Sequence, residues 1–269
     1  MKIVSWNVNS LRSAFRQGFL DWLAREKPDV VCLQEVRAQV AQLRALEEQL
    51  TGYRAIWHPA QRPGYAGVAI LTRYEPVEVE LGLCREADPE GRSLTVDFGS
   101  FRVGSYYAPN AIPGTAKILK KCLWLTQCRQ HVEAYADKPF VLAGDFNVAH
   151  TELDSQWVRH PVGMNGCTEE EREAFTALMQ AGRLFDPHRE ANKGSLLSTW
   201  WPLPEEQRTK QNGIRYDYIL VSQPNRLKTT EARIHHGVGG SDHCPVSLTV
   251  EVSTDALLVA ESRGQTRLF

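Results

Sequence analysis

The sequence lacks any apolar stretch long enough to cross a membrane. No window approaches the roughly 18 consecutive apolar residues that a membrane-spanning helix needs. The N-terminal stretch MKIVSWNVNSLRSAF places polar residues at every third or fourth position, so it cannot form the apolar core of a secretory signal peptide. We therefore expect a cytoplasmic protein with no membrane contact.

Cysteine is scarce, and charge of one sign is not in excess. The six cysteines show no CxxC spacing and several lie in apolar runs such as VVCLQ, which favours reduced, packed thiols over disulfides or structural zinc. Lys and Arg total 31 against 32 for Asp and Glu, giving a formal net charge of −1. A polyanionic partner would therefore have to be held by a local basic patch or a metal ion.

Repeats of fixed period are also absent, which argues against solenoids and propellers. Short runs rich in β-branched and aromatic residues alternate with stretches whose apolar residues recur at i, i+3 and i+4. The predicted strands are 2–6, 29–34, 67–72, 93–98, 102–108, 140–146, 215–222 and 244–252, and the predicted helices are 17–26, 40–50, 116–136 and 169–182. The alternation predicts α/β or α+β layers over residues 1–252, followed by a flexible tail over 253–269.

Unusual polar side chains stand at five predicted strand ends. They are Asn7, Glu35, Asp145 with Asn147, Asp217, and Asp242 with His243. A carboxylate at the end of a buried strand is costly unless it holds a metal, a proton or a partner. In an extended chain, Asn147 would project from the same side as Asp145. Singly, each acid could be a salt bridge or a cap, but together they indicate a pocket.

The chemistry of this set favours a hard cation. Carboxylate and amide oxygens suit Mg²⁺, with Mn²⁺ as a substitute, whereas zinc would call for more His or Cys. Glu35 and Asp242 are the predicted metal ligands. Asp217 could orient the imidazole of His243 and raise its pKa, leaving it a base or a cation beside a phosphoryl oxygen.

Nine short blocks follow one another along the chain: SWNVNSLR, LQE, GYAGVAIL, SYYAPNA, AGDFNVAH, GCTEEEREAF, STWW, RYDYILVS and GSDHCPV. Their content and order resemble the exonuclease III type of AP endonuclease, within the endonuclease/exonuclease/phosphatase superfamily. The resemblance covers essentially residues 1–250, and its fifth and sixth blocks are similar to the DNA repair branch. It implies a four-layer αββα sandwich, in which two mixed sheets pack face to face with helices outside.

The resemblance also implies roles for individual residues at a metal-dependent phosphodiester-cleavage site that uses one or two ions. Asn7 and Glu35 resemble the metal-site residues and Asp242 a further ligand, while Tyr107 resembles the active-site tyrosine. Asp145 resembles the acid that activates water or protonates the leaving oxygen, and Asn147 the amide that steadies the transition state; both also adjoin the metal site. Asp217 and His243 resemble the family's Asp–His pair.

The residues expected to bind DNA lie outside this set of site residues. Trp200 aligns with the aromatic of the family's sugar pocket, whereas its neighbour Trp201 could equally be a core residue. Asn110 is carried over from the family, and Arg92 is a candidate phosphate contact. Further basic candidates for phosphate contacts are Lys117, Lys120, Lys121, Arg208 and Lys210.

The last five residues, QTRLF, resemble the peptide by which bacterial repair proteins dock on the replication sliding clamp. Gln265 would be the hydrogen-bonding anchor, and Leu268 with Phe269 would plug an apolar groove.

The sequence thus predicts a monomeric, Mg²⁺-dependent nuclease of base excision repair, associated with the nucleoid if the source is bacterial. It would incise double-stranded DNA 5′ to abasic sites and remove blocking groups or nucleotides from 3′ ends. Ile112 and Pro113 stand where relatives place Gly and a basic residue, and Ile214 and Tyr216 also depart from some relatives. These departures leave open a 3′ exonuclease or phosphatase specialist with weak abasic incision. A non-catalytic DNA-binding protein on the same fold is a third alternative.

Overall fold

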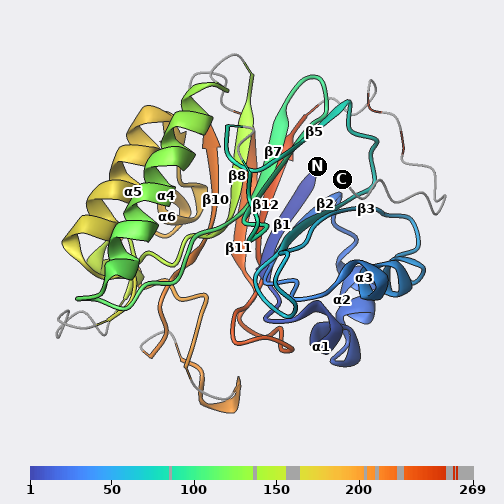
Figure 1. The fold of residues 1–269 in the computed structure, drawn as a ribbon, viewed down its shortest axis with the longest axis horizontal. Coiled ribbons are helices and arrows are strands. Elements are labelled where there is room, and N and C mark those ends of the chain that lie inside the picture. Colours follow the sequence, from blue (N-terminus) through green and yellow to red (C-terminus); the bar gives the residue numbers. More distant parts are fainter. Residues whose placement is uncertain are drawn as a thin grey trace.

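Two six-stranded sheets pack face to face, and helices cover both outer faces (Figure 1). The computed structural model describes residues 1–84, 87–135, 138–155, 164–202, 205–209, 212–222 and 227–252, together with Leu257 and Val259. Both sheets contain parallel and antiparallel pairs. The predicted four-layer sandwich of mixed sheets is therefore confirmed.

The first sheet has the strand order β11-β12-β1-β2-β4-β3. Its strands are β1 (Lys2–Asn7), β2 (Val30–Gln34), β3 (Arg54–His58), β4 (Val68–Thr72), β11 (Lys228–Ile234) and β12 (Val246–Glu251). The second sheet has the order β5-β6-β7-β8-β10-β9. Its strands are β5 (Glu78–Leu81), β6 (Ser93–Asp97), β7 (Arg102–Tyr107), β8 (Phe140–Asp145), β9 (Leu184–Phe185) and β10 (Asp217–Ser222).

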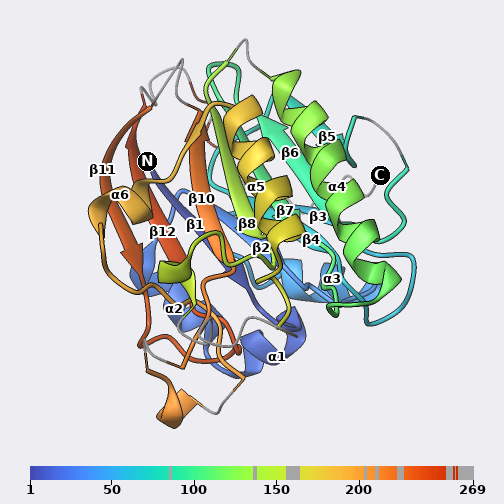
Figure 2. The same ribbon diagram turned by 90° about the vertical axis from the view of Figure 1, so that its left-hand side faces the viewer.

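Helices lie on the outer face of each sheet (Figures 1 and 2). The first sheet is covered by α1 (Leu11–Arg16), α2 (Phe19–Glu26) and α3 (Val40–Glu47), and the second by α4 (Ala116–Glu133) and α5 (Glu169–Ala181). The short helix α6 (Pro187–Ala191) contacts β10 of the second sheet and β11 of the first. Short 3-10 turns occur at Glu152–Asp154 and Glu205–Gln207. Among the described residues, no helix is both long and apolar enough to cross a bilayer.

Each sheet is covered by helices on one face and by the other sheet on the opposite face, which explains why the sequences of the central strands are unbroken apolar runs. On β1, Ile3 belongs to the core between the sheets, while Val4 packs beneath the helices. On β8, Val141 likewise faces the other sheet and Leu142 faces the outer helices. Since successive side chains point to opposite faces, a strand between two apolar layers needs apolar residues at every position.

All eight predicted strands and all four predicted helices are present, with small shifts of their ends. The sequence patterns missed β3, β5, β9 and β11, and the short helices α1 and α6. All four of these strands form sheet edges, and every residue of β11 is exposed or half-exposed. Edge strands carry charge and lack the apolar signature of central strands, which is why they escape pattern recognition.

Two residues of the predicted tail contact the domain. Leu257 packs against the core between the sheets, and Val259 forms an isolated antiparallel bridge with Tyr74. Tyr74 follows β4 at Thr72, which pairs with Val30 at the start of β2. The tail is therefore attached at the end of the sandwich that holds the beginnings of β1 and β2. Residues 265–269 lie outside the described residues.

A buried histidine makes stability depend on pH. His188 of α6 is 1% exposed, and its Nε2 lies 3.0 Å from the carbonyl oxygen of Ser247. Burial, reinforced by the Arg215 guanidinium, lowers the pKa of His188 from 6.5 to about 4. Between these values only the unfolded chain takes up the proton, so the free energy of unfolding falls as pH falls, by about 3 kcal/mol near pH 4.

We therefore expect the urea-unfolding free energy of His188→Gln to fall less steeply than that of the wild type between pH 6.5 and pH 4. The amide keeps an N–H donor for the Ser247 carbonyl but does not titrate. Equal slopes for the two proteins would contradict the assignment.

Candidate active site

The ends of three neighbouring strands bring polar side chains into one row. In the second sheet, Asp145 at the end of β8 is in register with Tyr107 of the parallel β7 and with Asp217 of the antiparallel β10. Asp145 and Asp217 are each 1% exposed. The register alone therefore places two buried carboxylates and a phenol at the same end of the sheet.

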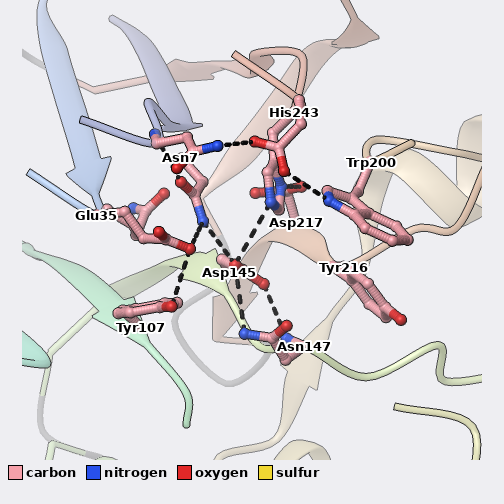
Figure 3. A network of polar contacts seen from close by, with 12 residues as sticks. Asn7, Glu35, Tyr107, Asp145, Asn147, Trp200, Tyr216, Asp217 and His243 are labelled. Carbon is pink, nitrogen blue, oxygen red and sulfur yellow. Dashed lines mark hydrogen bonds and ion pairs between the residues drawn. The ribbon is translucent and has the colours of Figure 1, made fainter. Parts of the chain in front are cut away.

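The first sheet contributes an amide and a carboxylate to the same place. Asn7 ends β1, opposite Gln34 of β2, and Glu35 follows directly. The Nδ2 of Asn7 donates to Glu35 Oε1 at 2.9 Å and to Asp145 Oδ2 at 2.8 Å, so one amide bridges acids from the two sheets (Figure 3). The Tyr107 hydroxyl also donates to Glu35 Oε1 at 2.9 Å, and the other Glu35 oxygen pairs with Arg37.

A tight turn holds Asn147 against Asp145. The prediction of an extended chain here is wrong, because Asn147 has a φ of 52°, in the left-handed region. Its backbone N–H donates to Asp145 Oδ1 at 2.9 Å, and its Nδ2 donates to the Ala108 carbonyl at 3.1 Å. A short polar side chain tolerates this conformation better than a branched one, and the aspartate oxygen stabilises the turn. The two side chains still lie together, but through a turn.

An imidazole lies between two carboxylates. His243 Nδ1 is 2.8 Å from Asp217 Oδ2, and Nε2 is 3.9 Å from Asp145 Oδ2. Burial by itself would lower the pKa of His243, but Asp217, followed by Asp145 and Asp242, raises it to about 10. The ring is therefore a cation at neutral pH, with its Nδ1–H donated to Asp217.

Three of these groups lie close enough to share a metal ion, but His243 would become a ligand only after losing its Nε2 proton, because an imidazolium nitrogen has no free lone pair. One ligand atom each from Glu35, Asp145 and His243 lie within 4.8 Å of one another. Burial raises the pKa of Asp145, and His243 opposes that rise. Two carboxylates close together in a buried site favour either a shared proton or a bound cation.

Asp242 is tied to different partners. Its Oδ1 accepts from Asn9 Nδ2 at 2.8 Å, and its Oδ2 accepts from Trp200 Nε1 at 3.0 Å. The sequence predicts Asp242 as a metal ligand, yet the structure groups Glu35 with Asp145 and His243, not with Asp242. Asn9 was not singled out from the sequence, although it is the second asparagine of the NVN block.

The two adjacent tryptophans have separate roles. Trp201 is 1% exposed and donates from Nε1 to the Thr209 carbonyl at 2.7 Å, so it is a core residue. Trp200 is only partly buried, and its ring centroid lies 5.5 Å from that of Tyr216 and 6.5 Å from that of His243. Trp200 and Tyr216 form one side of the site, opposite Glu35 and Tyr107 (Figure 3).

Arg92 is not at the surface, where the sequence predicts a phosphate contact. It is 4% exposed, and its guanidinium carbon lies 4.7 Å from the centroid of the Tyr107 ring. Its Nη1 donates to the Tyr107 carbonyl at 3.1 Å, its Nη2 to the Tyr65 hydroxyl, and its Nε to Glu90. A buried and fully engaged guanidinium supports the tyrosine from behind instead of meeting DNA.

Three of the other basic candidates are also engaged, while Lys117 and Asn110 are exposed. Lys120 pairs with Glu90, and Arg208 donates to the Ser241 carbonyl. Lys121 is fully buried, which contradicts its interpretation as a phosphate contact. Asn110 is exposed, and its Oδ1 accepts from Asn165 Nδ2 at 2.7 Å. Lys210 lies outside the described residues.

Comparison with known proteins adds three findings. The model of the endonuclease/exonuclease/phosphatase family matches residues 4–243. The chain is 35% identical over 258 residues to an exodeoxyribonuclease of Bacillus subtilis, covering 94% of this chain and 100% of that protein. It is 36% identical over 263 residues to the DNA repair nuclease APEX1 of Danio rerio, covering 94% of this chain and 83% of that protein.

A solved structure shares the fold over nearly the whole chain. The 3′-5′ exonuclease of Neisseria meningitidis is similar at a TM-score of 0.85 and 28% identity, covering 94% of this chain and 100% of that one.

Proposed function

We propose, from the premise that this chain belongs to the endonuclease/exonuclease/phosphatase family of phosphodiester-cleaving hydrolases, that it incises double-stranded DNA 5′ to abasic sites and clears blocked 3′ ends. The observation that carries this proposal is the bridge from Asn7 to Glu35 and Asp145, beside the His243–Asp217 pair. Such an enzyme would act where the chromosome lies, which in a bacterial cell is the cytoplasm.

The donor set fits magnesium, with manganese as a substitute and one or two ions. Glu35 and Asp145 offer carboxylate oxygens and Asn147 an amide oxygen, which are the ligands of a hard cation. Asn7 would orient the two acids through its Nδ2, since its Oδ1 accepts from the Asn9 backbone N–H. We propose Glu35 as the principal ligand, with Asp242 as a further candidate. A bound divalent ion would supply positive charge for the phosphate oxygens.

The protein side chains supply the remaining chemistry. Asp145, whose pKa is raised by burial, can accept or return a proton at Oδ2, either from water or at the leaving oxygen. The His243 imidazolium, held by Asp217, can stabilise negative charge that builds on the phosphoryl oxygens. The Tyr107 hydroxyl and the Asn147 amide can orient groups at the same phosphate.

We propose that Trp200 forms one wall of the pocket for an unpaired sugar and that Asn110 contacts a DNA phosphate.

A second candidate function is a 3′-end specialist that incises abasic sites poorly. The observation favouring it is Ile112, which is 54% exposed in the loop after Asn110 and followed by Pro113. An apolar side chain offers no charge to a phosphate and no hydrogen bond to a base edge.

One assay separates the two. Duplexes carrying an internal abasic analogue, or a nick with a 3′ phosphate, are incubated with Mg²⁺ and with EDTA. We expect Mg²⁺-dependent cleavage of both. Processing of only the nicked duplex would favour the 3′-end specialist, and cleavage of neither would contradict a nuclease function and revive the binding protein.

We further propose that the C-terminal QTRLF peptide docks this protein on the sliding clamp. The attachment of Leu257 and Val259 supports this, because it directs the chain to the end of the sandwich opposite Asp145. From Val259, the six residues to Gln265 reach at most about 20 Å. A docked partner would therefore leave the active site open to DNA.

Deletion of residues 265–269 is expected to abolish co-elution with the clamp, while cleavage of short duplexes stays at the wild-type rate. The control is Gln265→Glu, which keeps the length of the peptide and alters only its hydrogen-bonding anchor. Undiminished co-elution of the deletion variant would refute clamp docking.

A further inference from the structure

A fully buried ion pair lies directly behind the active site. Lys121 of α4 and Glu171 of α5 each have a side-chain exposure of 0%, and Lys121 Nζ lies 2.6 Å from Glu171 Oε1. Removing two charges from water is costly, and replacing such a pair by apolar residues often leaves stability unchanged or improves it. Helix packing alone therefore does not account for this pair.

The lysine makes another contact, and that contact reaches the site. Lys121 Nζ donates to the backbone carbonyl of Asn147 at 2.5 Å. Asn147 in turn donates from its backbone N–H to Asp145 Oδ1 and from its Nδ2 to the Ala108 carbonyl. The Lys121 ammonium therefore contacts one side of the turn at Asn147, and the other side of that turn contacts Asp145.

The glutamate fixes the lysine in turn. Glu171 Oε2 accepts from the backbone N–H of Thr168 at 3.1 Å, and the Thr168 hydroxyl accepts from the Glu171 backbone N–H, which forms the capping box of α5. The carboxylate therefore cannot turn away from Lys121 without uncapping the helix.

Neighbouring contacts brace the same turn. Arg172 Nε donates to the Ala149 carbonyl at 3.0 Å, so basic side chains from both α4 and α5 hold carbonyls of residues 147–149. A Cβ added to Gly166 would lie 2.2 Å from the Asn147 carbonyl oxygen. The backbone at Asn147 therefore has little room to move. A left-handed φ at a residue other than glycine persists only where the surrounding structure holds it in this way.

We propose that Lys121 and Glu171 are positioning residues, which hold Asn147 and through it Asp145 in the geometry needed for phosphodiester cleavage. The inference rests on the proposed function, and it assigns neither residue a contact with substrate. Misplacement of a catalytic group by about 1 Å can cost as much as 100-fold in rate.

The test uses Lys121→Met/Glu171→Leu, which removes both charges and keeps most of the volume. Each single change leaves one buried charge without its partner and is expected to lower the melting temperature strongly, whereas the double variant should recover most of it. We expect the double variant to keep the wild-type KM on the nicked 3′-phosphate duplex, while its kcat falls by roughly 10- to 100-fold. Lys228→Met, which removes an exposed lysine paired with Glu251 on the edge strand β11, should change neither value.

A mutant cycle with Asn147→Ala tests whether the effect passes through Asn147. In that background, the double change should lower kcat by less than about twofold, because residues that act through one another are not additive. A fully additive loss, or a folded double variant with wild-type kcat, would overturn the inference alone. A wild-type chain that cleaves neither test duplex would overturn the proposed function and this inference with it.

Discussion

Asp145→Asn is expected to lower kcat by roughly 10²- to 10⁴-fold while the protein stays folded and binds duplex DNA. The amide nearly matches the carboxylate in shape, so β8 and its pairing with β7 and β10 should persist. It cannot accept or return a proton at Oδ2, and it carries no charge beside His243. Single-turnover cleavage of the two test duplexes, with DNA affinity measured separately, checks both halves of the prediction.

The matched control is Asp97→Asn. Asp97 is also a buried aspartate at a strand end, 5% exposed, but it lies beside the start of β7, at the end of the sheet opposite Asp145, and pairs with Arg102 and Lys138. Its replacement should lower stability without changing kcat per folded molecule. An Asp145→Asn protein with wild-type turnover would refute the catalytic assignment.

Glu35→Gln should raise the Mg²⁺ concentration at half-maximal activity by at least about tenfold and reduce the maximal rate. The change removes one negative charge from the cluster of Glu35, Asp145 and His243, and cation affinity depends on that charge. The acceptor for Asn7 and Tyr107 is retained, so the surrounding hydrogen bonds should survive. Mg²⁺ titrations of cleavage, with circular dichroism to verify folding, measure the effect.

Asp242→Asn is the informative comparison. If the Asp242 carboxylate serves mainly to hold Asn9 and Trp200, its replacement should leave the Mg²⁺ midpoint near that of the wild type and instead weaken binding of the abasic duplex. A midpoint shifted as far as that of Glu35→Gln would identify Asp242 as a ligand of equal importance. A Glu35→Gln midpoint equal to that of the wild type would exclude Glu35 as a ligand.

The burial of Lys121 follows from its position on one face of α4. Lys121 belongs to a run of lysines that the sequence indicates as candidate phosphate contacts, yet it is buried with Trp124, Leu125 and Cys128. These residues follow it by three, four and seven positions, which is the spacing of one helical face. The helical phase therefore separates Lys121 from the exposed Lys120, whereas composition does not.

The tryptophan pair could not be resolved in this way. Trp200 and Trp201 are adjacent and chemically identical, and the segment around them is not a regular helix or strand. Their different environments depend on contacts far away in the chain, with Asp242 for Trp200 and with the His236 ring for Trp201. Arg92 is similar, because only the packing of Tyr65 and Tyr107 shows that its guanidinium is enclosed.

The sequence by itself determined the central strands, the main helices, the layered architecture and the identity of the polar residues at the strand ends. These properties are local, since they depend on periodicity and on the cost of burying a charge. Only the tertiary structure decided which of those residues meet. Asn7 reaches Asp145 across 138 positions of sequence because two different sheets pack face to face, and strand register, which flips every side chain when it shifts by one residue, places Asp217 beside Asp145.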